Sequence, residues 1–351
     1  MVNQKIVIIA GVIVLAGLLV GVYLVTDTAS DDDTVRVGYL PSTGHALYFI
    51  AYEQGFFEEE GLNVELNEFQ TGPDEINALL ADKLDVIAGG IGEPLRFINN
   101  NKDLYIIGGA MGGGSASIAN TPELAESLRN NPKEYEGKTV ATIKMSTPDV
   151  VIKGALKKEG VDLSKVNFVE FKTPADVIQA VKSGKAPIGL VWPPFQFTAE
   201  KQGLYIVKSS NEYLPDHPCC RIVTTSSKVE EDRDKWVRFE RALIKAYDYY
   251  QNNPDGSVEV VGKYVKMDPD ALKQALYDEN LSLSPDPNKK GILEYWELLE
   301  LLGYAEIKDP AALEKAIDTT IYKDALDQLA KENPNNNVYK ILLEQYAQLN
   351  E

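Results

Sequence analysis

The sequence predicts an α/β protein of two doubly wound lobes with a helical layer at its C-terminal end. Three observations lead to this fold class. Short apolar strands alternate with amphipathic helices from residue 35 to about 208, a segment within this stretch repeats, and helical periodicity dominates after Val229. Strands that alternate with helices predict mostly parallel sheets covered on both faces.

The first lobe is predicted from apolar runs that end in turn residues. Pro41 and Gly44 end the first run, and Thr71 is placed to cap the second helix. The pattern predicts strands over 35–39, 62–69, 84–88 and 104–110, and helices over 45–60, 73–81 and 93–99.

The second lobe begins after a glycine run, Gly112-Gly113-Gly114, that interrupts the alternation. A polar segment over 120–136 is predicted to be helical in part. The alternation then resumes, with strands over 139–143, 166–171, 188–192 and 205–208 and helices over 148–159 and 175–182.

An internal repeat relates the two lobes. Residues 68–83 match residues 170–185 without a gap, and seven of the sixteen positions are identical. The identical pairs are Glu68/Glu170, Phe69/Phe171, Thr71/Thr173, Asp74/Asp176, Ile76/Ile178, Ala78/Ala180 and Lys83/Lys185. Two amphipathic βα units can share a pattern without a common origin, but this many identities favours a true repeat. Two similarly built lobes would each offer strand-end loops to one cleft, because ligands bind beyond the carboxyl ends of parallel strands.

The C-terminal region is predicted to pack as helices on the first lobe. The helices are expected over 235–251, 270–277 and 290–302, with two more after Tyr322. Their regularly spaced aromatic residues are predicted to belong to the core.

The N-terminal region predicts a membrane anchor. Residues 6–25 form an uncharged apolar run, and twenty residues of helix span about 30 Å, the thickness of the hydrocarbon core. Lys5 precedes the run and an acidic tether over 26–34 follows it, so the body is expected outside the cytoplasm. Cleavage near Thr28-Ala29-Ser30, which would release a secreted body, is the alternative.

Composition excludes some classes of function. With a net charge of −18, the chain lacks the excess of basic residues that is typical of a nucleic-acid-binding protein. The two cysteines are adjacent, so the chain is not a disulfide-stapled scaffold. No metalloprotease, nucleophile-elbow, phosphate-loop or dinucleotide motif is present, and we predict no enzyme activity and no cofactor.

Several motifs resemble the nitrate, sulfonate, taurine and pyrimidine-precursor binding proteins of ATP-driven importers. The resemblance covers roughly residues 35–225. It is carried by Val37-Gly38-Tyr39-Leu40-Pro41, Gly55-Phe56-Phe57-Glu58, Thr71-Gly72-Pro73, Asp85-Val86-Ile87-Ala88-Gly89-Gly90, Ser146-Thr147 and Trp192-Pro193-Pro194. The chain departs from the family at Pro193, where an acidic residue is usual, and at Met145, where glycine is usual.

This resemblance implies the type II periplasmic-binding-protein fold, with lobe 1 over 35–111 and 219–351 and lobe 2 over 112–218. It implies crossings near 111–116 and 208–219, and hinge residues at Gly112, Gly113 and Gly114. It implies an extracytoplasmic receptor for a small anion such as a sulfonate, nitrate or taurine, with a permease and its ATPase as partners. The alternative is a pyrimidine-precursor binding protein or a synthase-like enzyme of the same fold.

The candidate ligand-binding residues lie at predicted strand ends and helix starts. They are Ser42, Thr43, Gly44, His45, Thr71, Gly72, Gly90, Ile91, Ser115, Ser146, Thr147, Trp192 and Cys219. Helix N-termini suit an oxyanion, whereas His45 and Trp192 suit a flat heterocycle. Thr71 and Ser146 have a second interpretation as plain N-caps, His45 as a surface residue and Trp192 as core.

A metal site is not predicted. Cys219, Cys220 and the two histidines are the only cysteine and histidine side chains. Adjacent residues on a strand point to opposite faces, so the two cysteines are not expected to bind one ion.

Overall fold

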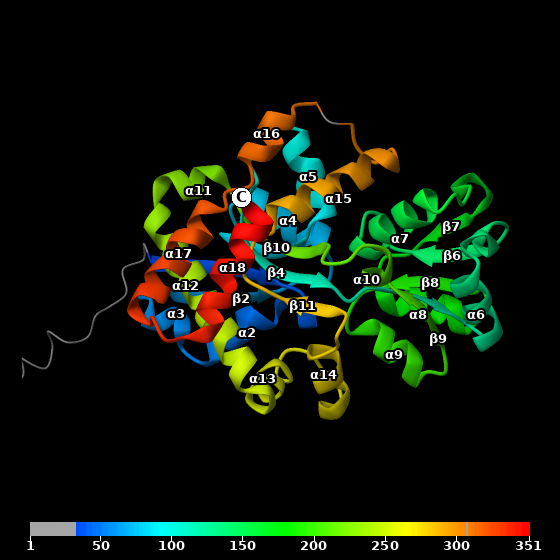
Figure 1. The fold of residues 1–351 in the computed structure, drawn as a ribbon, viewed down its shortest axis with the longest axis horizontal. Helices are drawn as coiled ribbons and strands as arrows, with labels where there is room; N and C mark the ends of the chain where they lie inside the picture. Colours follow the sequence, from blue (N-terminus) through cyan, green and yellow to red (C-terminus); the bar gives the residue numbers. More distant parts are fainter. Residues whose placement is uncertain (1–32, 307) are drawn as a thin grey trace, which may run out of the picture.

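The computed structural model describes residues 33–306 and 308–351, which form two lobes, each around its own β-sheet (Figure 1). The predicted anchor over 1–25 and nearly all of the acidic tether lie outside the described residues. Within the described part of the chain, no helix has the length and apolar character needed to cross a membrane.

The larger sheet has six strands in the order β11-β4-β10-β3-β1-β2. They are β1 (Thr34–Tyr39), β2 (Asn63–Glu68), β3 (Val86–Gly90), β4 (Tyr105–Gly113), β10 (Pro218–Thr224) and β11 (Leu281–Leu283). The smaller sheet has the order β7-β6-β8-β5-β9. Its strands are β5 (Ala116–Ala119), β6 (Thr139–Thr142), β7 (Asn167–Glu170), β8 (Ile188–Val191) and β9 (Tyr205–Ser209).

The two sheets share one topology over five strands. The order β4-β10-β3-β1-β2 in lobe 1 corresponds to β9-β5-β8-β6-β7 in lobe 2. Both sheets contain an inner strand antiparallel to its neighbours, β10 and β5, which the sequence pattern did not predict. Each of these strands follows directly after a crossing from the other lobe, so its direction is set by the crossing and not by a βα unit.

The repeated segments occupy equivalent places in the two lobes. Each supplies the edge strand and the next helix, namely β2 with α4 (Gly72–Leu80) and β7 with α8 (Pro174–Lys182). Thr71 and Thr173 cap these helices in the same way, because each hydroxyl accepts from the backbone N–H of the aspartate three residues later.

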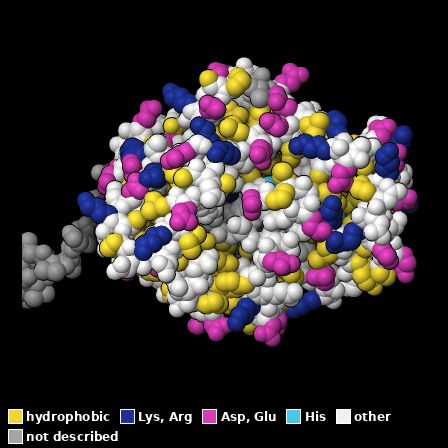
Figure 2. Space-filling view, viewed as in Figure 1, with side chains coloured by type: hydrophobic (Ala, Val, Ile, Leu, Met, Phe, Trp, Pro, Cys, Tyr) yellow, Lys and Arg dark blue, Asp and Glu magenta, His cyan; other side chains and the backbone are white. Residues whose placement is uncertain are grey.

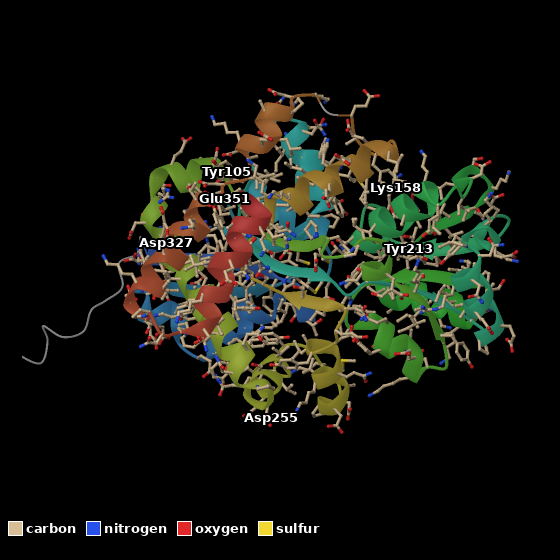
Figure 3. The ribbon with its side chains drawn as sticks, in the orientation of Figure 1. Tyr105, Lys158, Tyr213, Asp255, Asp327 and Glu351 are labelled. Atoms are coloured by element: carbon tan, nitrogen blue, oxygen red, sulfur yellow. The ribbon has the colours of Figure 1, made fainter. Side chains whose placement is uncertain are left out.

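Helices cover both sheets. Lobe 1 carries α2 (Ala46–Glu53), α3 (Phe56–Glu59) and α5 (Gly92–Asn99), and a 3-10 turn over Thr43–His45 precedes α2. The second lobe adds α6 (Pro122–Asn130), α7 (Thr147–Lys158), α9 (Phe195–Lys201) and α10 (Ser210–Tyr213), with 3-10 turns over Pro132–Tyr135 and Leu163–Lys165. Tyr213 marks this lobe in Figure 3. The single helix predicted over 45–60 is wrong: Gly55, in the left-handed region at φ 74°, divides it.

The C-terminal helices pack mainly on lobe 1. They are α11 (Ser226–Glu231), α12 (Arg233–Asn252), α13 (Pro254–Val261), α14 (Pro269–Leu276), α15 (Lys289–Leu301), α16 (Pro310–Lys315), α17 (Thr320–Glu332) and α18 (Asn337–Asn350). Helix α12 contacts α2, α3 and α17, and buries Trp236 and Phe239 in the lobe 1 core. The region is not wholly helical as predicted, since β11 adds an edge strand beside β4.

Helix α15 also reaches the second lobe. It lies beside α7, which ends at Lys158 (Figures 1 and 3). Val150 and Val151 of α7 are fully buried in the same apolar cluster as Tyr295 and Leu298 of α15. The two lobes therefore share part of a hydrophobic core.

Two connections join the lobes and run side by side. The backbone N–H of Ser210 donates to the Ser115 carbonyl at 2.7 Å, and that of Gly113 donates to the His217 carbonyl at 3.0 Å. Gly113 and Gly114 have φ of 64° and 76°. A Cβ on Gly113 would lie 2.3 Å from the Asn280 carbonyl oxygen, so the close packing requires glycine there. Hinge rotation at these glycines stays a prediction.

Candidate functional site

A cavity of about 490 Å³ lies between the lobes, and both contribute to its wall. The first lobe supplies Leu40, Ser42, His45, Gln70, Thr71, Gly72, Pro73, Asp74, Ile76, Gly89, Gly90, Glu93, Met111, Cys219 and Cys220. The second lobe supplies Ile143, Lys144, Met145, Ser146, Thr147, Pro148, Glu170, Phe171, Lys172, Pro174 and Trp192. Most of these residues follow a strand or begin a helix.

The structure places nine of the thirteen candidate residues on the cavity wall. They are Ser42, His45, Thr71, Gly72, Gly90, Ser146, Thr147, Trp192 and Cys219. Thr43, Gly44, Ile91 and Ser115 are not among the lining residues, and all four are buried. Their place is set by packing: a Cβ on Gly44 would lie 3.1 Å from the Met111 sulfur.

His45 presents a neutral imidazole to the cavity. It is 2% exposed, and burial lowers its pKa to about 3. Its Nδ1 accepts a hydrogen bond from the Leu40 backbone N–H at 3.1 Å, which leaves the proton of the neutral ring on Nε2. His45 is therefore a hydrogen-bond donor that stays uncharged at neutral pH.

The starts of α4, α7 and α8 open on the cavity. At α4 the Thr71 hydroxyl accepts from the Asp74 N–H and donates to the Asp74 carboxylate at 2.6 Å, so the capping interpretation applies. At α7 the Ser146 hydroxyl does not cap the helix and instead donates to the Ile143 carbonyl at 2.7 Å. The first backbone N–H groups of a helix favour anions.

Charged side chains on the wall were missed by the sequence analysis. Lys144 pairs with Glu170 at 3.4 Å, and Lys172 lies two residues beyond Glu170. Asp74 and Glu93 face the cavity from lobe 1, and burial raises the pKa of Glu93. The internal repeat could have indicated one of these residues. Lys172 occupies the position equivalent to Gln70, directly after the edge strand of its lobe, where ligand-contacting loops are expected.

Charges of both signs are also mixed on the outer surface. On the face shown in Figure 2, lysine and arginine side chains are interspersed with aspartate and glutamate. The acidic net charge thus does not form a single-sign patch on this face.

The lobes touch across the cavity rim. The Ser42 hydroxyl donates to the Pro193 carbonyl at 3.2 Å, and the Thr147 hydroxyl donates to the Cys219 carbonyl at 3.4 Å. A Cβ on Gly92 would lie 2.6 Å from the Met145 carbonyl oxygen. These contacts describe a closed arrangement of the two lobes.

The departure from the family at Met145 has a structural correlate. Met145 has φ of 62°, in the left-handed region that favours glycine. Its backbone N–H donates to the Asp149 carboxylate at 3.0 Å, which helps to hold this conformation. A methionine here adopts this conformation and adds a residue with a side chain to the cavity wall.

The premise that the two cysteine side chains point to opposite faces is wrong. Cys219 and Cys220 both line the cavity, and their sulfur atoms are 3.6 Å apart. The pairing of β10 with β4 shifts register on both sides of Cys220, and such an irregularity breaks the alternation of a regular strand. Among the described residues, no group of three or more histidine, cysteine, aspartate or glutamate side chains is arranged to hold a metal ion.

Comparison with known proteins decides the family. The sequence profile of the NMT1-like family matches residues 28–262. The chain belongs to the NMT1-like family. The resemblance stated from the motifs is thereby confirmed.

Relatives of similar sequence are binding proteins by name. The formylaminopyrimidine-binding protein of Halalkalibacterium halodurans is 25% identical over 252 residues, which are 67% of this chain and 73% of that protein. The taurine-binding periplasmic protein of Escherichia coli is 25% identical over 226 residues, which are 63% and 68% of the two chains.

Solved structures show the same fold. The periplasmic nitrate-binding protein of Synechocystis has a TM-score of 0.72 at 15% identity, over 85% of this chain and 89% of that one. The aliphatic sulphonate binding protein of Escherichia coli has a TM-score of 0.65 at 16% identity, over 82% and 92%. The two-lobed periplasmic-binding-protein fold predicted from the sequence is confirmed.

Proposed function

We propose that this chain is the extracytoplasmic solute receptor of an ATP-driven importer and captures a small organic anion of the sulfonate class between its lobes. The cavity between two topologically equivalent lobes is the observation that carries this proposal. A ligand that touches both walls stabilises the closed arrangement, and the closed form then docks on a membrane permease. The names of the relatives, which bind taurine, sulfonates and nitrate, support the same class.

Cavity size favours an organic solute. A volume of about 490 Å³ falls in the range of about 300–1,000 Å³ that is typical of small-molecule sites. A bare nitrate ion would fill only a small part of it. The anionic head would lie at the starts of α7 and α8 near Lys172, and the apolar part would contact Met111, Phe171 and Trp192.

A pyrimidine precursor is the second candidate solute. The neutral His45 ring offers one fixed donor, and the Trp192 ring lies on the opposite lobe. A flat heterocycle uses such a donor together with an aromatic wall. The formylaminopyrimidine-binding relative supports this candidate.

Thermal unfolding of the purified body with a ligand panel tests the proposal. The panel contains alkanesulfonates, taurine, nitrate, bicarbonate and formylaminopyrimidine. A bound solute at about 100 times its Kd adds about 2.7 kcal/mol of stability. We expect a rise in Tm with an alkanesulfonate, and the absence of any shift across the panel would contradict the proposal.

Variants then separate the two candidates. Lys172→Ala should weaken binding of a sulfonate about tenfold, which corresponds to about 1.4 kcal/mol. Lys182→Ala, at the C-terminal end of α8 and away from the cavity lining, is the control and should leave affinity unchanged. Loss of affinity in His45→Ala with no effect of Lys172→Ala would favour the heterocycle.

Two further parts of the proposal concern chemistry and location. We infer that the chain binds its solute unchanged, and a product formed in a turnover assay would refute this. We infer that residues 6–25 anchor the chain in the membrane with its body outside the cytoplasm. Recovery of the full-length chain in the soluble fraction, without detergent, would refute the anchor.

A further inference from the structure

Two free cysteines are placed together in the wall of the cavity. Cys219 and Cys220 are 4% and 8% exposed, and each contributes to the lining. Their sulfur atoms are 3.6 Å apart, within the distance of a thiol hydrogen bond. The register shifts between β10 and β4 on both sides of Cys220 accompany this arrangement, in which two consecutive side chains face one cavity.

The two thiols are chemically unequal. The pKa of Cys219 is lowered, first by a hydrogen bond from the Cys220 thiol and then by the Thr147 hydroxyl and the Arg221 guanidinium. The pKa of Cys220 is raised well above its ordinary value, because it donates that hydrogen bond and is buried. A thiolate and not a thiol is the nucleophile in sulfur chemistry, so Cys219 is the sulfur prepared to attack.

We propose that Cys219 and Cys220 form a vicinal dithiol modification site that closes to an intramolecular disulfide when a small-molecule disulfide enters the cavity. This proposal depends on the cavity and the sulfur geometry alone and not on the identity of the transported solute. Its ligand class is a thiol-reactive oxidant such as oxidised glutathione.

The exchange proceeds in two balanced steps. The Cys219 thiolate attacks one sulfur of the oxidant, a mixed disulfide forms, and the other half leaves as a thiolate that takes up a proton. Cys220 then loses its proton and attacks the Cys219 sulfur, which breaks the mixed disulfide and expels the second half as a thiol. Two protein thiols are oxidised, and one small disulfide is reduced to two thiols.

Geometry predicts that the resulting bond is labile. The sulfur atoms must approach to about 2.0 Å, and the Cα atoms of adjacent residues are about 3.8 Å apart, below the usual range of about 4.4–6.8 Å for disulfides. Strained disulfides are more easily reduced. The pair is thus suited to reversible modification and not to structural cross-linking.

Mass spectrometry of the intact chain tests the proposal. The protein is incubated with oxidised glutathione, denatured, alkylated and weighed, and the absence of other cysteines removes any background. We expect the native chain to lose two hydrogen atoms and to accept no alkyl group. Cys220→Ser should accumulate one glutathione adduct, because no second thiol is present to complete the disulfide, and neither single variant should lose two hydrogen atoms.

A trivalent arsenical provides an independent readout that needs no oxidation. Phenylarsine oxide should bind the native chain in a one-to-one complex through two sulfur–arsenic bonds, with release of water, and neither single variant should retain it. Far-UV circular dichroism verifies that the variants are folded. Two separate glutathione adducts on the native chain, or two alkylatable thiols after full exposure to the oxidant, would overturn the proposal.

Discussion

The two lobes have the same five-strand order and the same capped helix after the edge strand, yet their interiors differ in polarity. In the repeat, Glu75 of α4 corresponds to Val177 of α8, and both are fully buried. The opposite holds for the helices that follow β1 and β6: α2 buries only apolar side chains, whereas α7 buries Asp149 and Lys153. Repeated topology therefore does not require repeated chemistry, and the two lobes bury ionisable side chains at different positions of the shared plan.

The buried pair of α7 lies where the lobes meet. The Lys153 ammonium is 2.5 Å from the Asp149 carboxylate, and the Tyr304 hydroxyl, from the segment after α15, donates to the same carboxylate at 2.7 Å. Asp149 also accepts from the Thr142 hydroxyl at 2.8 Å. A fully hydrogen-bonded pair in this position links α7 to the C-terminal helices of lobe 1.

Replacement of Asp149 by alanine should have the largest effect. It would leave the Lys153 charge buried without its counter-ion, which costs about 3–5 kcal/mol. Urea denaturation should show this loss in the free energy of unfolding. Adding Lys153→Met to Asp149→Ala should restore part of the stability. If the free energy of unfolding of Asp149→Ala lay within about 1 kcal/mol of that of the native chain, the pair would contribute little to stability.

The buried carboxyl of Glu75 in lobe 1 predicts a pH dependence of the stability. Burial raises the pKa of Glu75 from its ordinary value to about 8, and neither oxygen has a hydrogen-bond partner among the described residues. Because the folded-state pKa is raised, its contribution to stability is complete below the ordinary pKa and is lost as the pH rises through about 8.

Glu75→Gln tests this directly. Relative to the variant, the native chain should lose up to about 1.4 kcal/mol of unfolding free energy per pH unit across that window. Urea titrations from acidic to alkaline pH measure the difference. Glu123→Gln, an exposed first-turn glutamate of α6, is the control and should leave the slope unchanged. If the unfolding free energies of Glu75→Gln and of the native chain depended on pH in the same way, the raised pKa of Glu75 would be contradicted.

Closure of the lobes depends on a glycine in lobe 1 where lobe 2 has Pro194. A Cβ on Gly92 would lie 2.6 Å from the Met145 carbonyl oxygen of the other lobe. Gly92→Ala should therefore separate the lobes at a cost of about 1–3 kcal/mol, and it should lower solute affinity about tenfold or more. Small-angle scattering should show a larger radius of gyration.

Gly90→Ala serves as the matched control for closure, because an added Cβ there meets no atom within 4 Å. Its scattering curve should equal that of the native chain. Unchanged scattering and affinity in Gly92→Ala would show that the rim contact does not limit closure.

Much of this difference between the lobes could not be predicted from the sequence. Strand ends and N-caps were predictable because they depend on residues close in sequence, and the repeat implied the cleft. Short strands such as β5, with four small or apolar residues, form only through distant partners. The common orientation of Cys219 and Cys220 depends on a register shift between β10 and β4, which no local pattern specifies.

The smallest expected effect concerns the feature that the lobes share most closely. The hydroxyls of Thr71 and Thr173 accept from the N–H of Asp74 and Asp176 at 3.4 and 3.2 Å. Each replacement by alanine should cost about 1 kcal/mol of stability. The two costs should add in the double variant, because additivity holds for distant sites without shared partners.

Thr71 lines the cavity whereas Thr173 does not. Calorimetric titration with the identified solute should therefore distinguish the two threonines. We expect equal losses of stability in both variants but a loss of solute affinity only in Thr71→Ala, because Thr71 then serves both the fold and the site. Equal affinities in the two variants would show that both threonines act only as helix caps.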